Sequence, residues 1–351
     1  MANRRSFIAG MFAAGALPRA TWAQVGSPAF LSAGMAPDGT FVLCGLSRDG
    51  QITFQRSLPA RGHAAAAHPV RAEAVAFARR PGTFAIVLDC ATGTQTAQLD
   101  APYGRHFYGH GAFSPDGDLL FTTENDFDAG RGVIGVWDVS DGYRRLGEVG
   151  SGGVGPHDIK LMPDGASLVI ANGGIETHPE TGRTKLNIPT MRPNLSYIDF
   201  DGQLLDQIEL DPAHRKNSIR HLAVSAQGSV VFAMQWQGDL TEDLPLLGVH
   251  NSTAGTVDLV GDASVQTMNG YLGSVAVSRN GAQIATTSPR SGTLQIFEGP
   301  TLRSETRLRD ICGVAATDTG FYATTGTGLA VAPSGQRVAH PVAWDNHLVP
   351  I

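Results

Sequence analysis

A short turn phrase recurs along the chain: an apolar stretch leads into a polar turn that ends in Gly, and a second apolar stretch follows. Pro sets φ for the first turn position, Asp or Asn tolerates the next one, and Gly supplies the positive φ that closes a hairpin. Apolar residues alternate beside the turns, as in 119–123 (LLFTT), which is typical of half-buried strands. The copies are 35–39 (MAPDG), 113–117 (FSPDG), 161–165 (LMPDG), 224–228 (VSAQG) and 277–281 (VSRNG).

A repeat of roughly 40–60 residues with room for four strands is typical of a β-propeller. We therefore predict an all-β fold, a seven-bladed β-propeller of four-stranded antiparallel blades, as a single domain over residues 24–351. The first and last strands are expected to pair within one blade, because this removes the open sheet edge. Blade four carries an insertion, 173–195, and in blade two 79–82 (RRPG) replaces the usual first turn. The expected blades run over 27–59, 70–103 and 110–152, and the next four begin at His157, Arg220, Leu272 and Val314.

The first residues have the pattern of an export signal. Residues 3–8 (NRRSFI) form a twin-arginine pattern, an apolar run follows over 9–17, and small residues at 21–23 are typical of a cleavage region. The apolar run is much shorter than the ~20 residues that a bilayer needs, which argues against a membrane anchor. We therefore predict a twin-arginine signal peptide over 1–23, a mature protein in the periplasm, and no membrane contact after cleavage.

The net charge narrows the class of partner, and the positions of the cysteines indicate whether they form a disulfide. Removal of the leader, which carries three arginines and no acidic residue, changes the formal net charge from −6 to −9. A mildly acidic chain without a basic cluster argues against nucleic acid as a partner. Cys44, Cys90 and Cys312 each lie in or beside an apolar run, which favours buried thiols, although a Cys44–Cys90 disulfide remains possible if their blades are adjacent.

Histidines recur at corresponding positions of the blades. The first strand of a blade runs to the turn and the second returns, so the start of the first and the end of the second share one face. His63 lies in the connection entering blade two, His178 lies in the blade-four insertion, and His347 points to the same face if the chain ends on a fourth strand. Consecutive blades three to five then bring together His110, Glu124, Asn125, His157, Asn172, Arg220, His221 and Gln235 at one mouth of the channel.

Imidazole and carboxylate groups from separate strands are typical ligands of iron, copper or zinc. We therefore predict a metal site, or more generally a small-molecule site, at this mouth. The alternatives are a hydrolase in which a His or Glu124 activates water while Arg220 positions a carboxylate, a protein-interaction scaffold, and histidines that only satisfy channel backbone and water. The predicted metal ligands are His63, His110, Glu124, His157, His178 and His221, and the predicted ligand contacts are Asn125, Asn172, Arg220, Gln235 and His347.

Several phrases together resemble one bacterial family, the DUF1513 proteins of unknown function. The phrases are 61–63 (RGH), 78–82 (ARRPG), 108–117 (YGHGAFSPDG), 123–126 (TEND), 155–158 (GPHD), 171–179 (ANGGIETHP), 218–222 (SIRHL) and 345–347 (DNH). The resemblance implies an exported seven-bladed propeller, similar in appearance to the lactonase and YncE-like group, and it implies no activity. Such proteins look like companions of periplasmic iron-uptake components, so the resemblance favours a metal role and an iron-uptake protein as partner.

Overall fold

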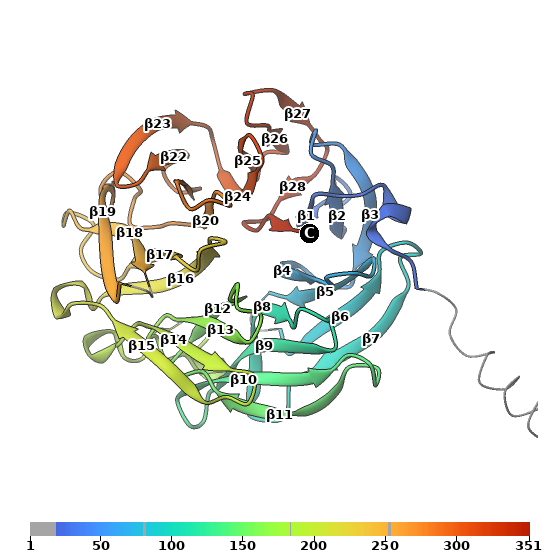
Figure 1. Cartoon of the computed structure of the whole chain (residues 1–351), viewed down its shortest axis with the longest axis horizontal. Coiled ribbons are helices and arrows are strands. Elements are labelled where there is room, and N and C mark those ends of the chain that lie inside the picture. The colour runs from blue at the N-terminus through green and yellow to red at the C-terminus, as the bar shows by residue number, and fades with distance from the viewer. Residues whose placement is uncertain (1–18, 80–81, 183, 252–253) are drawn as a thin grey trace, which may run out of the picture.

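The computed structural model describes residues 19–351 apart from 80–81, 183 and 252–253, and it is a closed ring of seven blades (Figure 1). Residues 1–18, which hold most of the predicted leader, lie outside the described residues. The seven blades of antiparallel strands confirm the predicted fold. Within the described residues, no helix has the length and apolar character needed to span a membrane.

Blades two to seven each consist of four consecutive strands, and the first strand of each lies innermost (Figure 1). Blade two consists of β4 (Gly62–Ala67), β5 (Glu73–Ala78), β6 (Phe84–Asp89) and β7 (Gln95–Asp100), and blade three of β8 (Arg105–Phe113), β9 (Leu119–Asp126), β10 (Arg131–Asp138) and β11 (Arg144–Gly150). Blade four consists of β12 (Pro156–Leu161), β13 (Ser167–Asn172), β14 (Asn194–Asp199) and β15 (Leu204–Glu209), and blade five of β16 (Asn217–Val224), β17 (Val230–Trp236), β18 (Pro245–Asn251) and β19 (Thr256–Ser264). Blade six consists of β20 (Ser274–Val277), β21 (Gln283–Ser288), β22 (Thr293–Glu298) and β23 (Thr301–Arg307), and blade seven of β24 (Ile311–Thr317), β25 (Gly320–Thr325), β26 (Leu329–Val331) and β27 (Arg337–Ala339).

Blade one closes the ring with both ends of the chain. Its outer strands are β1 (Phe30–Met35), β2 (Phe41–Leu46) and β3 (Ile52–Leu58), and its innermost strand is made of two short C-terminal pieces, β28 (Ala343–Trp344) and β29 (Val349–Pro350). Both pieces pair antiparallel with β1. The expected pairing of the first and last strands is therefore confirmed, and it removes the open edge that a sheet would otherwise expose.

The recurring turns have the conformation that their sequence predicts. Gly117, at the end of the β8–β9 turn, has φ of +78°, which Gly adopts without steric cost. Asp116 accepts a hydrogen bond from the backbone N–H of Asp118 at 3.0 Å. Apolar side chains fill the space between neighbouring blades, as where Phe77 of β5 meets Phe107 of β8 with ring centroids 6.0 Å apart. The local turn chemistry and the inter-blade core thus specify the same arrangement.

The assignment of strands within blade two was wrong by one strand. The turn 79–82, expected as the first turn of the blade, is its second turn, because it leads from β5 into the third strand, β6, and the innermost strand is β4. The first turn of the blade lacks the usual Pro-Asp-Gly phrase. Instead, Nδ1 of His68 accepts the backbone N–H groups of Val70 and Arg71 at 3.1 and 3.0 Å, the role that Asp116 and Asp164 have in the first turns of blades three and four.

Residues 19–25 pack against blade two. The 3₁₀ helix η1 (Trp22–Val25) buries Trp22, whose Nε1–H donates to the carbonyl of His68 at 2.9 Å. The other short 3₁₀ helices are η2 (Pro179–Thr181) and η3 (Ile188–Thr190) in the blade-four insertion, and η4 (Pro212–His214). All three cysteines are buried free thiols, so the Cys44–Cys90 disulfide does not form.

Candidate functional site

Most of the innermost strands are interrupted near one mouth of the channel. The pairing with the second strand shifts between Gly62 and Ala65 in β4, between Phe107 and Gly111 in β8, and between Ile219 and His221 in β16. β12 and β24 carry the same kind of shift, and the gap between β28 and β29 occupies the corresponding place in blade one. A β-bulge turns a side chain away from its regular face. These bulges therefore aim side chains at the channel axis.

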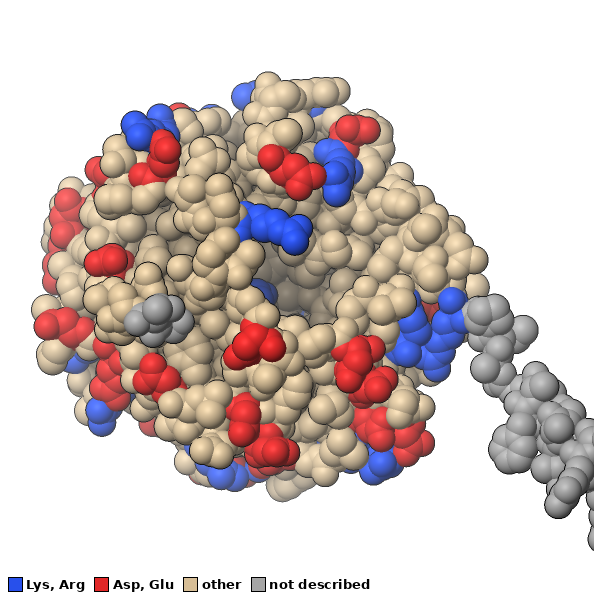
Figure 2. All heavy atoms as spheres, in the orientation of Figure 1, with Lys and Arg blue, Asp and Glu red and all other residues tan. Residues whose placement is uncertain are grey.

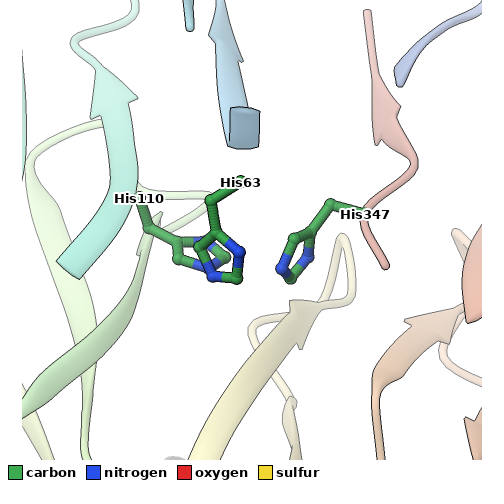
Figure 3. A group of neighbouring side chains, drawn as sticks. All are labelled: His63, His110 and His347. Atoms are coloured by element: carbon green, nitrogen blue, oxygen red, sulfur yellow. The ribbon is translucent and has the colours of Figure 1, made fainter. Parts of the chain in front are cut away.

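Five histidines come from these interruptions and meet in the channel. The ring centroids of His63, His110, His157, His221 and His347 lie 4.6 to 6.0 Å from their neighbours in the group. Figure 3 shows the imidazoles of His63, His110 and His347 pointing toward one another. We call these five residues the histidine cluster. They come from blades two, three, four, five and one, so residues far apart in the sequence form one group.

One nitrogen of every imidazole in the histidine cluster is buried and has no hydrogen-bond partner among the described residues. These atoms are Nδ1 of His63, His157 and His221, and Nε2 of His110 and His347. The ligand nitrogens of His63, His110 and His347 lie within 4.8 Å of one another, and so do those of His110, His157 and His221. Three convergent imidazoles are a common ligand set for a transition metal. The histidine cluster could therefore hold a metal ion.

A buried carboxylate fixes the orientation of His110. Oδ1 of Asp158 lies 3.1 Å from Nδ1 of His110, and because a carboxylate only accepts, Nδ1 donates to it and Nε2 is the nitrogen left without a partner among the described residues. Asp158 is itself held by Nζ of Lys160 at 3.0 Å and by the backbone N–H of Leu222 at 3.0 Å. This is the carboxylate–histidine arrangement that orients metal ligands in many proteins.

Four imidazoles of the histidine cluster favour their neutral form, those of His63, His157, His221 and His347. Burial, followed by the charge of neighbouring imidazoles, lowers the pKa of His63, His157 and His347 well below the ordinary value. Burial, followed by His110, lowers the pKa of His221 to about 3. Burial alone would raise the pKa of Asp158, but Lys160 and His110 hold this pKa well below its usual range. Neutral imidazoles beside an ionised carboxylate are the protonation states that bind a cation.

Two cavities adjoin the histidine cluster. One, of about 180 Å³, is lined by His63, His157 and His221 and by residues of the loops at the mouth. The other, of about 390 Å³, continues along the channel and is lined by His110, His221 and His347. The molecule is visibly hollowed at the centre of the ring (Figure 2). The histidine cluster therefore separates two spaces within one channel.

Glu124 and His178, both predicted as metal ligands, are not part of the histidine cluster. Glu124 is fully buried within blade three, where both of its oxygens bind the guanidinium of Arg145 at 2.8 and 2.9 Å. Successive strand residues point to opposite faces, so Thr123 reaches the carbonyl of His110 while Glu124 faces away. His178 lies on the blade-four insertion, against the ring of Phe127 at 5.0 Å, and its Nδ1 accepts a backbone N–H within the insertion.

The predicted ligand contacts divide into two groups. Arg220 and Gln235 line the 180 Å³ cavity, and His347 belongs to the histidine cluster. The two asparagines instead tie loops together. Asn125 donates to the carbonyl of Thr177 at 3.0 Å, and Asn172 donates to the carbonyl of Ser151 at 2.9 Å. The sequence placed both asparagines at the correct strand ends, but it did not show that their side-chain amides bind the backbone carbonyls of neighbouring loops.

Other residues of the mouth were not predicted. The 180 Å³ cavity is also lined by Arg79, Tyr108, Lys185, Tyr271 and Asn346. Arg79 was missed because its segment was assigned to the opposite end of blade two. Lys185 belongs to the blade-four insertion, and the position of that insertion at the mouth was the signal that could have identified it.

These observations define the class of protein: a seven-bladed β-propeller with a histidine-lined channel. Residues 56–351 match the family described as "Protein of unknown function (DUF1513)", and the chain belongs to this family. No curated protein sequence matches the chain significantly. Among solved structures, hydrazine synthase of Kuenenia stuttgartiensis is similar, with a TM-score of 0.61 and 13% identity over 92% of this chain and 96% of that chain. At this identity the similarity shows the propeller fold alone.

Proposed function

We propose that the protein binds one transition metal ion, iron, copper or zinc, at the histidine cluster. The observation that supports this proposal is the set of five buried imidazole nitrogens without a hydrogen-bond partner among the described residues. Buried polar atoms are nearly always hydrogen-bonded, so five exceptions at one point need an explanation. A metal ion would satisfy several of them at once.

The expected stoichiometry is one ion per chain. The two groups of three histidines share His110. Because Nδ1 of His110 is taken by Asp158, only Nε2 is available, and one nitrogen lone pair binds one ion at a time. All-imidazole sites suit zinc, copper and ferrous iron, and three protein ligands leave a coordination position open for a further ligand. A site of this kind serves binding or catalysis rather than structure alone.

Elemental analysis of protein purified without a histidine tag tests the proposal. We expect close to one equivalent of iron, copper or zinc, which His110→Ala and His157→Ala reduce strongly. His178→Ala is the matched control, because His178 lies outside the histidine cluster, and we expect it to keep full metal content. Metal at background level in the native chain after incubation with each of the three ions, or equal content in all variants, would contradict the proposal.

Hydrolysis of a small ester, such as a lactone, is a second candidate. It is favoured by the 180 Å³ cavity, which reaches the histidines directly. Glu124 has no part in it, since Arg145 holds both of its oxygens, and the water would be activated by a histidine or by the bound ion. Turnover of a lactone panel by metal-loaded protein, lost in His157→Ala, would support this candidate, and turnover equal to buffer would remove it. Similarity to lactonase and YncE-like propellers stays a prediction.

We also propose that the protein is exported to the periplasm by the twin-arginine route and acts there beside an iron-uptake protein. Residues 3–8 support the export proposal. Replacement of Arg4 and Arg5 by Lys should retain the protein in the cytoplasm, as measured by cell fractionation. Equal periplasmic amounts of both forms would contradict this route. Capture of an iron-uptake component from the periplasmic fraction by the wild-type protein would support the partner.

A further inference from the structure

The cavity over the histidine cluster has an unusual balance of charge. Arg79, Lys185 and Arg220 line it, and none of its described lining residues is Asp or Glu. Asp345 contacts Arg79 at 3.4 Å and Arg61 at 2.9 Å, and it is not a lining residue. The charged side chains that line the cavity are therefore cationic.

The cations also act on one another and share the cavity with histidines. Burial, followed by the charges of Arg220 and Arg290, lowers the pKa of the Lys185 ammonium. The guanidinium of Arg290 lies over the ring of Tyr271, 4.4 Å from its centroid, at the edge of the same cavity. Arg220 lines the same cavity as His63, His157 and His221. The cationic side chains and three imidazoles of the histidine cluster therefore face one space.

This arrangement of charge opposes the binding of a bare divalent cation. Imidazole ligands carry no negative charge, and Asp158 contacts the histidine cluster at His110 and lines the 390 Å³ cavity rather than the 180 Å³ cavity. An ion of charge +2 would therefore share the wall of the 180 Å³ cavity with the cationic side chains of Arg79, Lys185 and Arg220. An anion in the cavity would remove the conflict, because it attracts both the ion and the side chains.

We propose that the cavity binds a small anionic oxygen donor, a carboxylate or an oxyanion, that occupies the open coordination position of the metal ion. Arg220 and Lys185 bind the anion, and a guanidinium suits a carboxylate or oxyanion because its N–H groups form a planar fork. The proposal rests on the proposed metal binding. Because each ligand favours the other, metal and anion bind cooperatively, and the coupling is the same in both directions.

The test uses the full chain loaded with Co²⁺, whose visible absorption reports its ligands, and acetate or sulfate as the anion. Ionic strength is held constant with perchlorate. We expect a saturable change of the Co²⁺ spectrum, with an apparent dissociation constant that rises at least about fivefold in R220Q and in K185Q. R48Q is the matched control, since it removes one positive charge far from the cavity, where Arg48 pairs with Asp318; it should behave as the wild type. Acetate and sulfate distinguish a carboxylate site from an oxyanion site.

A second readout separates attraction of the anion from structural damage. In buffer without acetate or sulfate, R220Q and K185Q should bind Co²⁺ more tightly than the wild type, because a repelling charge is gone. A variant that is only misfolded would bind more weakly. Co²⁺ uptake with no spectral response to either anion, or with equal responses in all variants, overturns the anion site and leaves the metal site standing. Absence of Co²⁺ uptake by the wild type overturns both.

Discussion

Replacement of Asp158 by Asn should weaken metal binding without emptying the site. Oδ1 of Asp158 accepts from Nδ1 of His110 and from Lys160, and Oδ2 accepts from the backbone N–H of Leu222 at 3.0 Å. An Asn amide has one accepting oxygen, so its NH₂ group must face another donor. We expect Asn to keep its oxygen toward His110 and to place its NH₂ against Leu222.

The magnitude follows from two separate losses. Loss of the carboxylate that orients a metal-bound His typically lowers metal affinity by about 10- to 100-fold, which is about 1.4–2.7 kcal/mol. The unsatisfied N–H of Leu222 costs about 1–3 kcal/mol of unfolding free energy. D158N should therefore bind the ion more weakly and also melt at a lower temperature than the wild type.

Competition with a chromophoric chelator measures the affinity, and urea unfolding of the metal-free protein measures the stability. D164N is the matched control: Asp164 accepts two backbone N–H groups in the β12–β13 turn, at 2.8 and 2.9 Å, and does not contact the histidine cluster. It should lose stability and keep its metal affinity. A D158N protein whose affinity stays within about twofold of the wild type would refute the role of Asp158 as the residue that positions His110.

Three further predictions concern groups outside the histidine cluster. E124Q should lower the unfolding free energy by about 3 kcal/mol and leave metal affinity unchanged, because Glu124 binds Arg145 within the blade; a loss of metal in a folded E124Q protein would contradict this. Burial, followed by the charge of Arg71, lowers the pKa of His68 from 6.5 to about 4. The neutral form is thus favoured in the folded state, so the contribution of His68 to stability is full above pH 6.5 and falls as the pH drops toward 4. Thermal unfolding from pH 7.5 to 4 should show a smaller acid loss in H68N, and identical profiles would disprove the assignment. Burial raises the pKa of each thiol to about 12, so a thiol reagent at pH 8 should modify none of them in the folded protein and all three after unfolding; fast reaction of the native protein would be the contrary result. The thiols are those of Cys44, Cys90 and Cys312.

The blade architecture could be predicted because it is encoded locally. Pro, Asp and Gly in the turns and alternating apolar residues beside them define each hairpin within a few positions. The strand prediction for blade two was wrong for a physical reason. His68 holds the turn there with its ring nitrogen, and His is not a residue that a turn pattern contains.

For the candidate site, the sequence predicted which strands carry the residues but not the direction in which each side chain points. His110, His157 and His221 lie on the innermost strands β8, β12 and β16, and ring closure brings them together. The face of each side chain depends on the bulges, such as the one between Phe107 and Gly111, which break the alternation that a sequence pattern relies on. Glu124 was expected beside His110 because its strand end lies at the same mouth, but alternation along β9 turns Thr123 toward His110 and Glu124 into the blade interior.

Closure of the ring would constrain when the proposed metal ion can be bound. His347 lies between β28 and β29, the two segments that join the end of the chain to β1. An unfinished polypeptide therefore lacks one imidazole and the enclosure that buries the others. Ion uptake would follow completion of the toroid, and the captured ion would then act as a cross-link between its two termini, slowing their separation.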